Sequence, residues 1–128
     1  MPDIEIERTI EWSDTDASGH VHNGIAGRLL EAAEAELLGR LGLLDMVPTM
    51  PRVRLVFEFR ERLWFGQRVS VRLRVAELGR TSLTWAMTVT GPDGGVAITG
   101  EAVVVHAPGP SAEPWPPEAR AALTPASG

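Results

Sequence analysis

Residues 14–23 read DTDASGHVHN and lie between two segments whose hydrophobic residues repeat with different periods. Before this stretch, isoleucines at positions 4, 6 and 10 alternate with polar residues, which predicts a strand with one buried face. After it, residues 24–41 carry apolar side chains every three or four positions, which predicts an amphipathic helix. The stretch is therefore a strand-to-helix loop that presents two acids, two histidines, a serine and an asparagine.

Period-two alternation returns after Pro51 and predicts four more strands. They lie near residues 53–60, 69–75, 83–90 and 96–105. The turn sequences ELGR at 77–80 and GPDGG at 91–95 are typical of hairpin connections. Because the sheet must bury one face, this order predicts an α+β domain. We expect a five-stranded antiparallel sheet, with its last four strands in meander order, to wrap around one long central helix.

The chain is expected to form one domain at residues 1–107, since 128 residues suit a single core and the sequence has no internal repeat. Residues 108–128 are rich in Pro, Ala and Ser, which predicts a C-terminal tail with little structure of its own. Trp115 is an apolar residue in this tail that could dock on the domain.

The composition excludes several functional classes. The net charge of -5 argues against general nucleic-acid binding, which needs clustered positive charge. The absence of Cys excludes disulfides, thiolate nucleophiles and Cys-ligated metals. The first residues, MPDIEIERTI, lack the basic and apolar regions of a signal peptide, and no apolar run approaches the length of a membrane span. We therefore expect a cytoplasmic protein with no membrane partner.

The chain resembles the 4-hydroxybenzoyl-CoA thioesterase family of hot-dog fold proteins. The family pattern, D-x-D-x-x-G-x-V before a helix with an internal Glu, is matched by Asp14, Asp16, Gly19, Val21 and Glu31. The segment FEFRERLWFGQRVSVRLRVAELGRTSL at 57–83 resembles the second half of the family, and the likeness covers about residues 4 to 106. The resemblance implies an acyl-CoA or acyl-carrier-protein thioesterase that forms a homodimer or homotetramer. It implies no metal and no cofactor other than the CoA or phosphopantetheine of the substrate.

The chain departs from the family pattern at three positions. Ala26 stands where members usually carry Tyr, Asn23 where many carry His, and Gln67 where many carry Asp. Ala26 and Gly27 leave room that a Tyr would fill, which suggests a pocket for an aryl, long or polyketide-like acyl group.

The resemblance implies that Asp16 is the catalytic carboxylate. A carboxylate can attack a thioester directly or activate the attacking water. The structural alternative is that the Asp16 side chain forms an Asx-type turn that caps the end of the strand. The unpaired amides at the helix start, near Asn23, are suited to hold the developing oxyanion, although Asn23 also suits a plain N-cap. Glu31 is a second candidate acid, with an ion pair to Arg28 or another Arg as its alternative, whereas Asp14 is expected to be structural.

The remaining candidates bind substrate. In the family the hairpin at 80–82 helps to hold the CoA phosphates, for which an Arg fork is well suited. The two histidines are read as lining the substrate channel rather than as metal ligands, with a general-base role for His22 kept open. The predicted substrate-binding residues are Trp12, Gly19, His20, Val21, His22, Ala26, Phe57, Arg80, Thr81 and Ser82.

Two other functions stay open on the sequence alone. An enoyl-thioester hydratase or dehydratase on the same fold would need Asp16 and a histidine to converge on one carbon. A non-catalytic module that binds acyl thioesters would keep the fold without the chemistry, because a fold does not fix a function.

Overall fold

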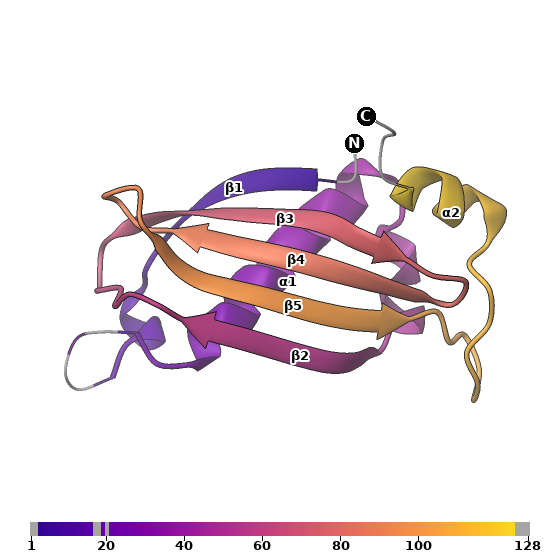
Figure 1. The fold of residues 1–128 in the computed structure, drawn as a ribbon, viewed down its shortest axis with the longest axis horizontal. Coiled ribbons are helices and arrows are strands. Elements are labelled where there is room, and N and C mark those ends of the chain that lie inside the picture. Colours follow the sequence, from indigo (N-terminus) through magenta and orange to yellow (C-terminus); the bar gives the residue numbers. More distant parts are fainter. Residues whose placement is uncertain (1–2, 17–18, 20, 125–128) are drawn as a thin grey trace.

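Five antiparallel strands form one sheet that curves around a single long helix, as the computed structural model shows (Figure 1). The structure describes residues 3–16, 19 and 21–124. The strands are β1 (Asp3–Thr9), β2 (Arg52–Phe59), β3 (Arg68–Leu78), β4 (Ser82–Thr90) and β5 (Val96–Val105). The helices are η1 (Trp12–Asp14), α1 (Gly24–Arg40), η2 (Leu44–Thr49) and α2 (Pro117–Leu123). The predicted fold class is confirmed.

The strand order β1-β3-β4-β5-β2 differs in one respect from the predicted meander. Strands β3, β4 and β5 follow one another through the two predicted hairpins, but β2 pairs with β5 and not with β3. A tight hairpin forces its two strands to be neighbours. The connection at residues 60–67 is longer and imposes no such constraint, so β2 occupies the edge opposite β1.

The core lies between the inner face of the sheet and helix α1. Alternate residues of β3 and β4 are buried, as the period-two pattern predicts, and α1 buries a stripe of Ile, Ala and Leu side chains. Trp85 on β4 is fully buried, and its Nε1 donates a hydrogen bond of 2.8 Å to Glu34 on α1. Glu34 also accepts hydrogen bonds from Arg52, the nearer at 3.1 Å. The buried acid on the helix therefore has hydrogen-bond partners on two strands of the sheet.

The segment after β5 is more ordered than the sequence predicts. Trp115 is buried, stacks on His106 with ring centroids 5.3 Å apart, and donates from Nε1 to the Ser82 carbonyl at 3.1 Å. Helix α2 follows and buries Ala119 and Leu123 in the same core. The prediction of little structure is wrong here, because prolines suit the first turn of a helix as well as a tail.

No helix in the described part of the chain is long and apolar enough to cross a membrane.

Candidate active site

The loop that carries Asp16 is closed by a short antiparallel pairing. Thr15 pairs with Val21, and the backbone N–H of His22 donates to the Asp14 carbonyl at 2.9 Å. Within the loop, the N–H of Gly19 donates to the Asp16 carbonyl at 3.0 Å. Gly19 has a φ of +90°, a conformation that side chains rarely adopt, so a glycine is needed at this turn. Asp16 is therefore the first residue of a turn that ends at Gly19, and it is exposed. The segment that leads into α1 follows directly after this turn.

The connection between β2 and β3 supports this loop from the other side. Val21 N–H donates to the Leu63 carbonyl at 2.9 Å, and Phe65 N–H donates to the Gly19 carbonyl at 3.3 Å. Gln67 accepts a hydrogen bond of 2.9 Å from the Trp64 N–H through its side chain. The loop is thus held by backbone bonds to a neighbouring turn as well as by its own.

Asp14 anchors the loop to the helix, as its expected structural role requires. Arg28 on α1 binds its carboxylate through two nitrogens of the guanidinium, Nε to Oδ1 at 2.7 Å and Nη2 to Oδ2 at 2.6 Å. The Glu11 N–H donates to the same carboxylate at 2.8 Å. Burial alone would raise the pKa of Asp14, but the hydrogen bonds from Arg28 and Glu11 outweigh it, and the pKa lies below its usual value.

Arg28 therefore pairs with Asp14 and, at 3.3 Å, with Glu11, so the alternative pairing with Glu31 is wrong.

At the start of α1, the side chain that bonds the first helix amide is that of His22 and not that of Asn23. Asn23 occupies the N-cap position, as the sequence predicts, but its side chain makes no capping hydrogen bond. Instead the Gly24 N–H donates to His22 Nδ1 at 3.1 Å, and the Ile25 N–H donates to the His22 carbonyl at 3.2 Å. The Ala26 N–H donates to the Asn23 carbonyl at 3.4 Å. Among the residues described, the Asn23 N–H is the amide at this helix start that donates no hydrogen bond.

An exposed aromatic cluster flanks the loop. Trp12 on η1 is 66% exposed and meets Phe65 edge to face, with ring centroids 5.4 Å apart. Phe65 is 56% exposed, and Trp64 beside it is also exposed. Trp12 is therefore an exposed aromatic residue at the rim of the loop, and its predicted contact with substrate stays a prediction.

Not all predicted site residues gather at this end of the molecule. Ala26 is fully buried in the core, so the room predicted beside it is not an opening on the surface of this protomer. Glu31 is exposed two turns along α1, about 10 Å from the helix start. It lines a cavity of about 500 Å³ between α1, η2 and β2. The other residues that line this cavity are Glu34, Ala35, Leu44, Val47, Pro48 and Arg52.

Phe57 and the predicted CoA contacts lie elsewhere on the sheet. Phe57 on β2 faces inward, and its ring lies so close to Gly100 that a Cβ there would approach it to 2.6 Å. Arg80, Thr81 and Ser82 form the β3–β4 hairpin at the end of the sheet opposite the loop, about 30 Å along β3 (Figure 1). His20 lies outside the described residues.

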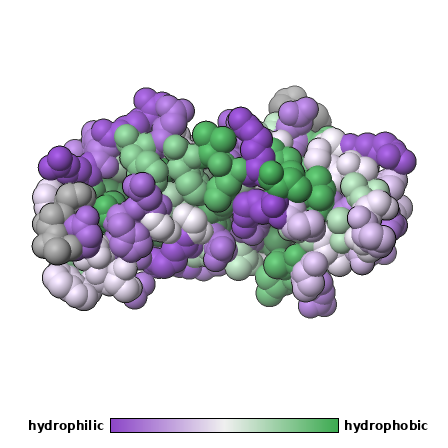
Figure 2. Space-filling model, turned by 90° about the horizontal axis from the view of Figure 1, so that it is seen from below, coloured by the Kyte–Doolittle hydropathy of each residue, from purple (hydrophilic) through white to green (hydrophobic). Residues whose placement is uncertain are grey.

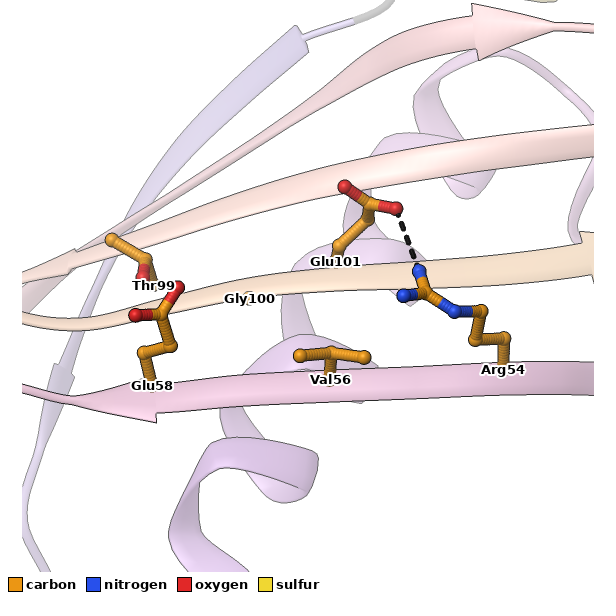
Figure 3. Close-up of a pocket in the computed structure, with 6 residues that line it drawn as sticks. All are labelled: Arg54, Val56, Glu58, Thr99, Gly100 and Glu101. Atoms are coloured by element: carbon orange, nitrogen blue, oxygen red, sulfur yellow. Dashed lines mark hydrogen bonds and ion pairs between the residues drawn. The ribbon is translucent and has the colours of Figure 1, made fainter.

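A depression of about 230 Å³ on the outer face of the sheet contains none of the predicted site residues. Figure 3 shows it over Gly100, between the Arg54–Glu101 ion pair of 2.9 Å and the side chains of Glu58 and Thr99. Exposed ion pairs of this kind contribute little to the stability of a fold. In the described ranges, no three His, Asp or Glu side chains are grouped closely enough to hold a metal ion.

Two of the residues that build the site region are not found by the sequence interpretation. The periodicity places Arg28 on the solvated side of the helix, although its position one turn after the helix start puts it within reach of the loop. Glu34 stands four residues after Leu30 and three before Leu37, a spacing that places it on the buried stripe.

Comparison with known proteins places this chain in a family. A family model described as the thioesterase-like superfamily matches residues 10–123. A hypothetical protein from Thermus thermophilus is 29% identical with a TM-score of 0.85, over 93% of this chain and 95% of its own. A thioesterase from the same species, solved with coenzyme A and zinc, is 25% identical with a TM-score of 0.85, again over 93% and 95%. A variant 4-hydroxybenzoyl-CoA thioesterase, complexed with 4-hydroxybenzoyl-CoA, shares the fold at 18% identity and a TM-score of 0.83, over 97% and 100%.

Among curated protein sequences, none matches the chain significantly. The match to the family model spans most of the chain. This chain therefore belongs to the thioesterase-like superfamily, which confirms the family resemblance seen in the sequence and the enzyme class, thioester hydrolase, that it implies.

Proposed function

We propose that this protein hydrolyses an acyl thioester of coenzyme A, with Asp16 as nucleophile or general base and the Asn23 N–H as the oxyanion donor. The observation that carries the proposal is the site loop itself. It holds an exposed carboxylate beside a helix start whose following amides are already bonded, while the Asn23 amide is not. The solved thioesterase with bound coenzyme A makes a CoA thioester the preferred substrate class.

The proposed reaction needs only these two groups and water. The thioester carbonyl oxygen accepts a hydrogen bond from the Asn23 N–H, which stabilises the charge that develops there. The Asp16 carboxylate either attacks the carbonyl carbon, forming an anhydride that water cleaves, or removes a proton from the attacking water. The carbon–sulfur bond breaks, the thiolate leaves, and the products are a carboxylic acid and free CoA.

We also propose that the protein is a homodimer joined through β2, alone or within a tetramer. Strand β2 is an edge of the sheet, and it exposes Val53, Leu55, Val56 and Phe59 by 41 to 59%. Figure 2, which views the molecule from the β2 side, shows hydrophobic residues gathered across this face. An exposed apolar edge strand is a template for pairing with a second strand.

Such a pairing would complete the site. An antiparallel β2–β2 contact places the first residues of one β2 beside the last residues of the other. The last residues of β2 lead to the turn at 60–67 that supports the Asp16 loop, and its first residues border the cavity that Glu31 lines. The partner would therefore bring its Glu31 cavity, as an acyl pocket, and its hairpin at 80–82, as a CoA contact, toward this protomer's Asp16.

The dimer has a direct test. Leu55→Glu places a charge on the edge strand, so we expect it to yield a monomer with little activity, because charges block strand pairing. Val96→Glu is a matched control, since Val96 is also an exposed apolar residue, on β5. Light scattering coupled to gel filtration gives the mass of each. A monomeric wild-type protein, or a Leu55→Glu variant with unchanged mass and activity, contradicts the proposal.

The reaction is tested by product analysis. Purified protein is offered a panel of short, long, branched and aryl acyl-CoAs and a matching set of acyl-carrier-protein thioesters. Thiol release with formation of the free acid supports hydrolysis. The set that is hydrolysed with the higher kcat/KM, acyl-CoAs or acyl-carrier-protein thioesters, identifies the carrier. Water added to a crotonyl- or cinnamoyl-type thioester without thiol release would make the protein a hydratase. Tight binding without any turnover would make it a binding module.

A further inference from the structure

We infer that His22 is a positioning residue for the proposed hydrolysis, because its ring ties both arms of the Asp16 loop together and selects the Asn23 amide as oxyanion donor. The inference rests on the proposed function. It assigns His22 neither to substrate contact nor to proton transfer, the two roles that the sequence suggested, because both ring nitrogens are already bonded to the backbone.

The two bonds of the ring define its tautomer. Nδ1 accepts the hydrogen bond of 3.1 Å from the Gly24 N–H and therefore carries no proton. Nε2 lies 3.0 Å from the Ser13 carbonyl oxygen and must donate to it, so the proton is on Nε2. One side chain thus joins the residue before Asp14 to the first residue of α1, across the mouth of the loop.

Gly24 is shaped to receive this ring. A Cβ at position 24 would lie 2.9 Å from Cε1 of His22, closer than a Cβ approaches another heavy atom in folded proteins, and 3.0 Å from Nδ1, which is also a tight contact. No side chain fits there while the imidazole keeps its place. The glycine at the first position of the helix and the histidine two residues earlier are therefore parts of one arrangement.

The bond from Gly24 to the His22 ring determines which backbone N–H at the helix start is available as the oxyanion donor. The His22 ring occupies the Gly24 N–H, and the Ile25 and Ala26 amides are bonded to preceding carbonyls. The Asn23 N–H is left as the donor, in a fixed direction, which is what oxyanion stabilisation requires. The bond to the Ser13 carbonyl lies next to Asp14, which Arg28 holds, so His22 and Arg28 together fix the chain that leads into Asp16.

Three variants separate the two bonds of the ring. The amide oxygen of Asn reaches the place of Nδ1, and the amide nitrogen of Gln reaches the place of Nε2. His22→Asn therefore keeps the bond to Gly24, His22→Gln keeps the bond to Ser13, and His22→Ala loses both. We expect His22→Ala to lower kcat about ten- to hundredfold, because small misplacements cost this much. KM should stay within about twofold, because ground-state binding is not altered. The kcat values of the Asn and Gln variants should each fall less than that of His22→Ala.

A double-mutant cycle tests the link to Gly24. Ala is the better helix former, so a Gly24→Ala change has no reason of its own to harm the helix. It should nevertheless lower kcat, because it displaces the His22 ring. In the His22→Ala background it should cost little more, which makes the two effects strongly non-additive. The inference would be overturned if the kcat losses of Gly24→Ala and His22→Ala simply multiplied in the double variant. It would also be overturned if His22→Ala kept the wild-type kcat, or if it lowered only the thermal stability of the protein.

A measurement without substrate keeps this inference distinct from the proposed function. Nitrogen-15 NMR of the neutral imidazoles should show His22 with its proton on Nε2. His106 should have the opposite tautomer, since its Nδ1 lies 3.0 Å from the Pro114 carbonyl and must donate. Finding the proton of His22 on Nδ1 would refute the arrangement even in an active enzyme. If the tautomer is as expected but wild-type protein cleaves no thioester, the proposed function fails and the role of His22 in that reaction fails with it.

Discussion

Asp16→Asn should lower kcat for thioester hydrolysis by about a thousandfold or more, while the variant still binds acyl-CoA. An amide of nearly the same shape can neither attack the carbonyl carbon nor take a proton from water, so the loss falls on the chemical step. The exposed position of Asp16 means that folding should be little changed. Thiol release gives kcat, and fluorescence titration with a non-hydrolysable acyl-CoA analogue gives the affinity.

Asp93→Asn is the matched control for this variant. Asp93 is an exposed acid in the β4–β5 hairpin, and its side chain accepts a hydrogen bond of 2.9 Å from the Gly95 N–H that an Asn can also accept. Its kcat should equal that of the wild type. If Asp16→Asn keeps wild-type kcat while Glu31→Gln loses it, the catalytic carboxylate is Glu31 and the assignment of Asp16 is wrong.

Arg28→Met should lower the free energy of unfolding by about 2 to 4 kcal/mol, because it leaves a buried carboxylate without its cation. The Asp14 side chain is 5% exposed, and Arg28 supplies two of its charged hydrogen bonds. Arg40→Met is the control, since Arg40 is exposed and lies 3.8 Å from Glu36. That variant should lose about 0.5 kcal/mol or less. Urea unfolding measures both, and equal losses would contradict the role given to Arg28.

The cost of Arg28→Met should also depend on pH. The pKa of Asp14 is lowered in the folded protein, so its contribution to stability is present above the unfolded value of about 3.8. That contribution is lost as the pH falls through the folded pKa. The difference in stability between wild type and Arg28→Met should therefore be largest near neutrality and shrink below about pH 4. A difference that does not change with pH would mean that Asp14 and Arg28 act only through packing.

Periodicity predicts the elements of this fold well, because burial on one face requires apolar side chains at alternate residues of a strand or at every third and fourth residue of a helix. It does not predict neighbours. The tight turns at 77–80 and 91–95 establish that β3, β4 and β5 are adjacent, but nothing in residues 60–67 indicates that β2 lies at the far edge. The order around Trp115 is not predictable from composition, because tails and docked segments can both be rich in proline.

The candidate site also has features that the sequence predicts and features that it does not. Asp16, Gly19 and Asn23 are predicted together because they are close in sequence, and any strand-to-helix loop would keep them close. The bonds of Arg28 and His22 depend on side-chain directions that no residue pattern specifies. The hairpin at 80–82 is assigned to the site by resemblance alone, whereas within one protomer it lies at the other end of the sheet.

The most direct test is the rate of thiol release from acyl-CoAs by wild-type protein and Asp16→Asn, measured side by side on the same panel. A thioesterase that works through Asp16 should release CoA from at least one acyl-CoA with a kcat/KM about a thousandfold above that of the variant. Wild-type protein that binds these thioesters but releases CoA no faster than Asp16→Asn from any of them would contradict the proposed function.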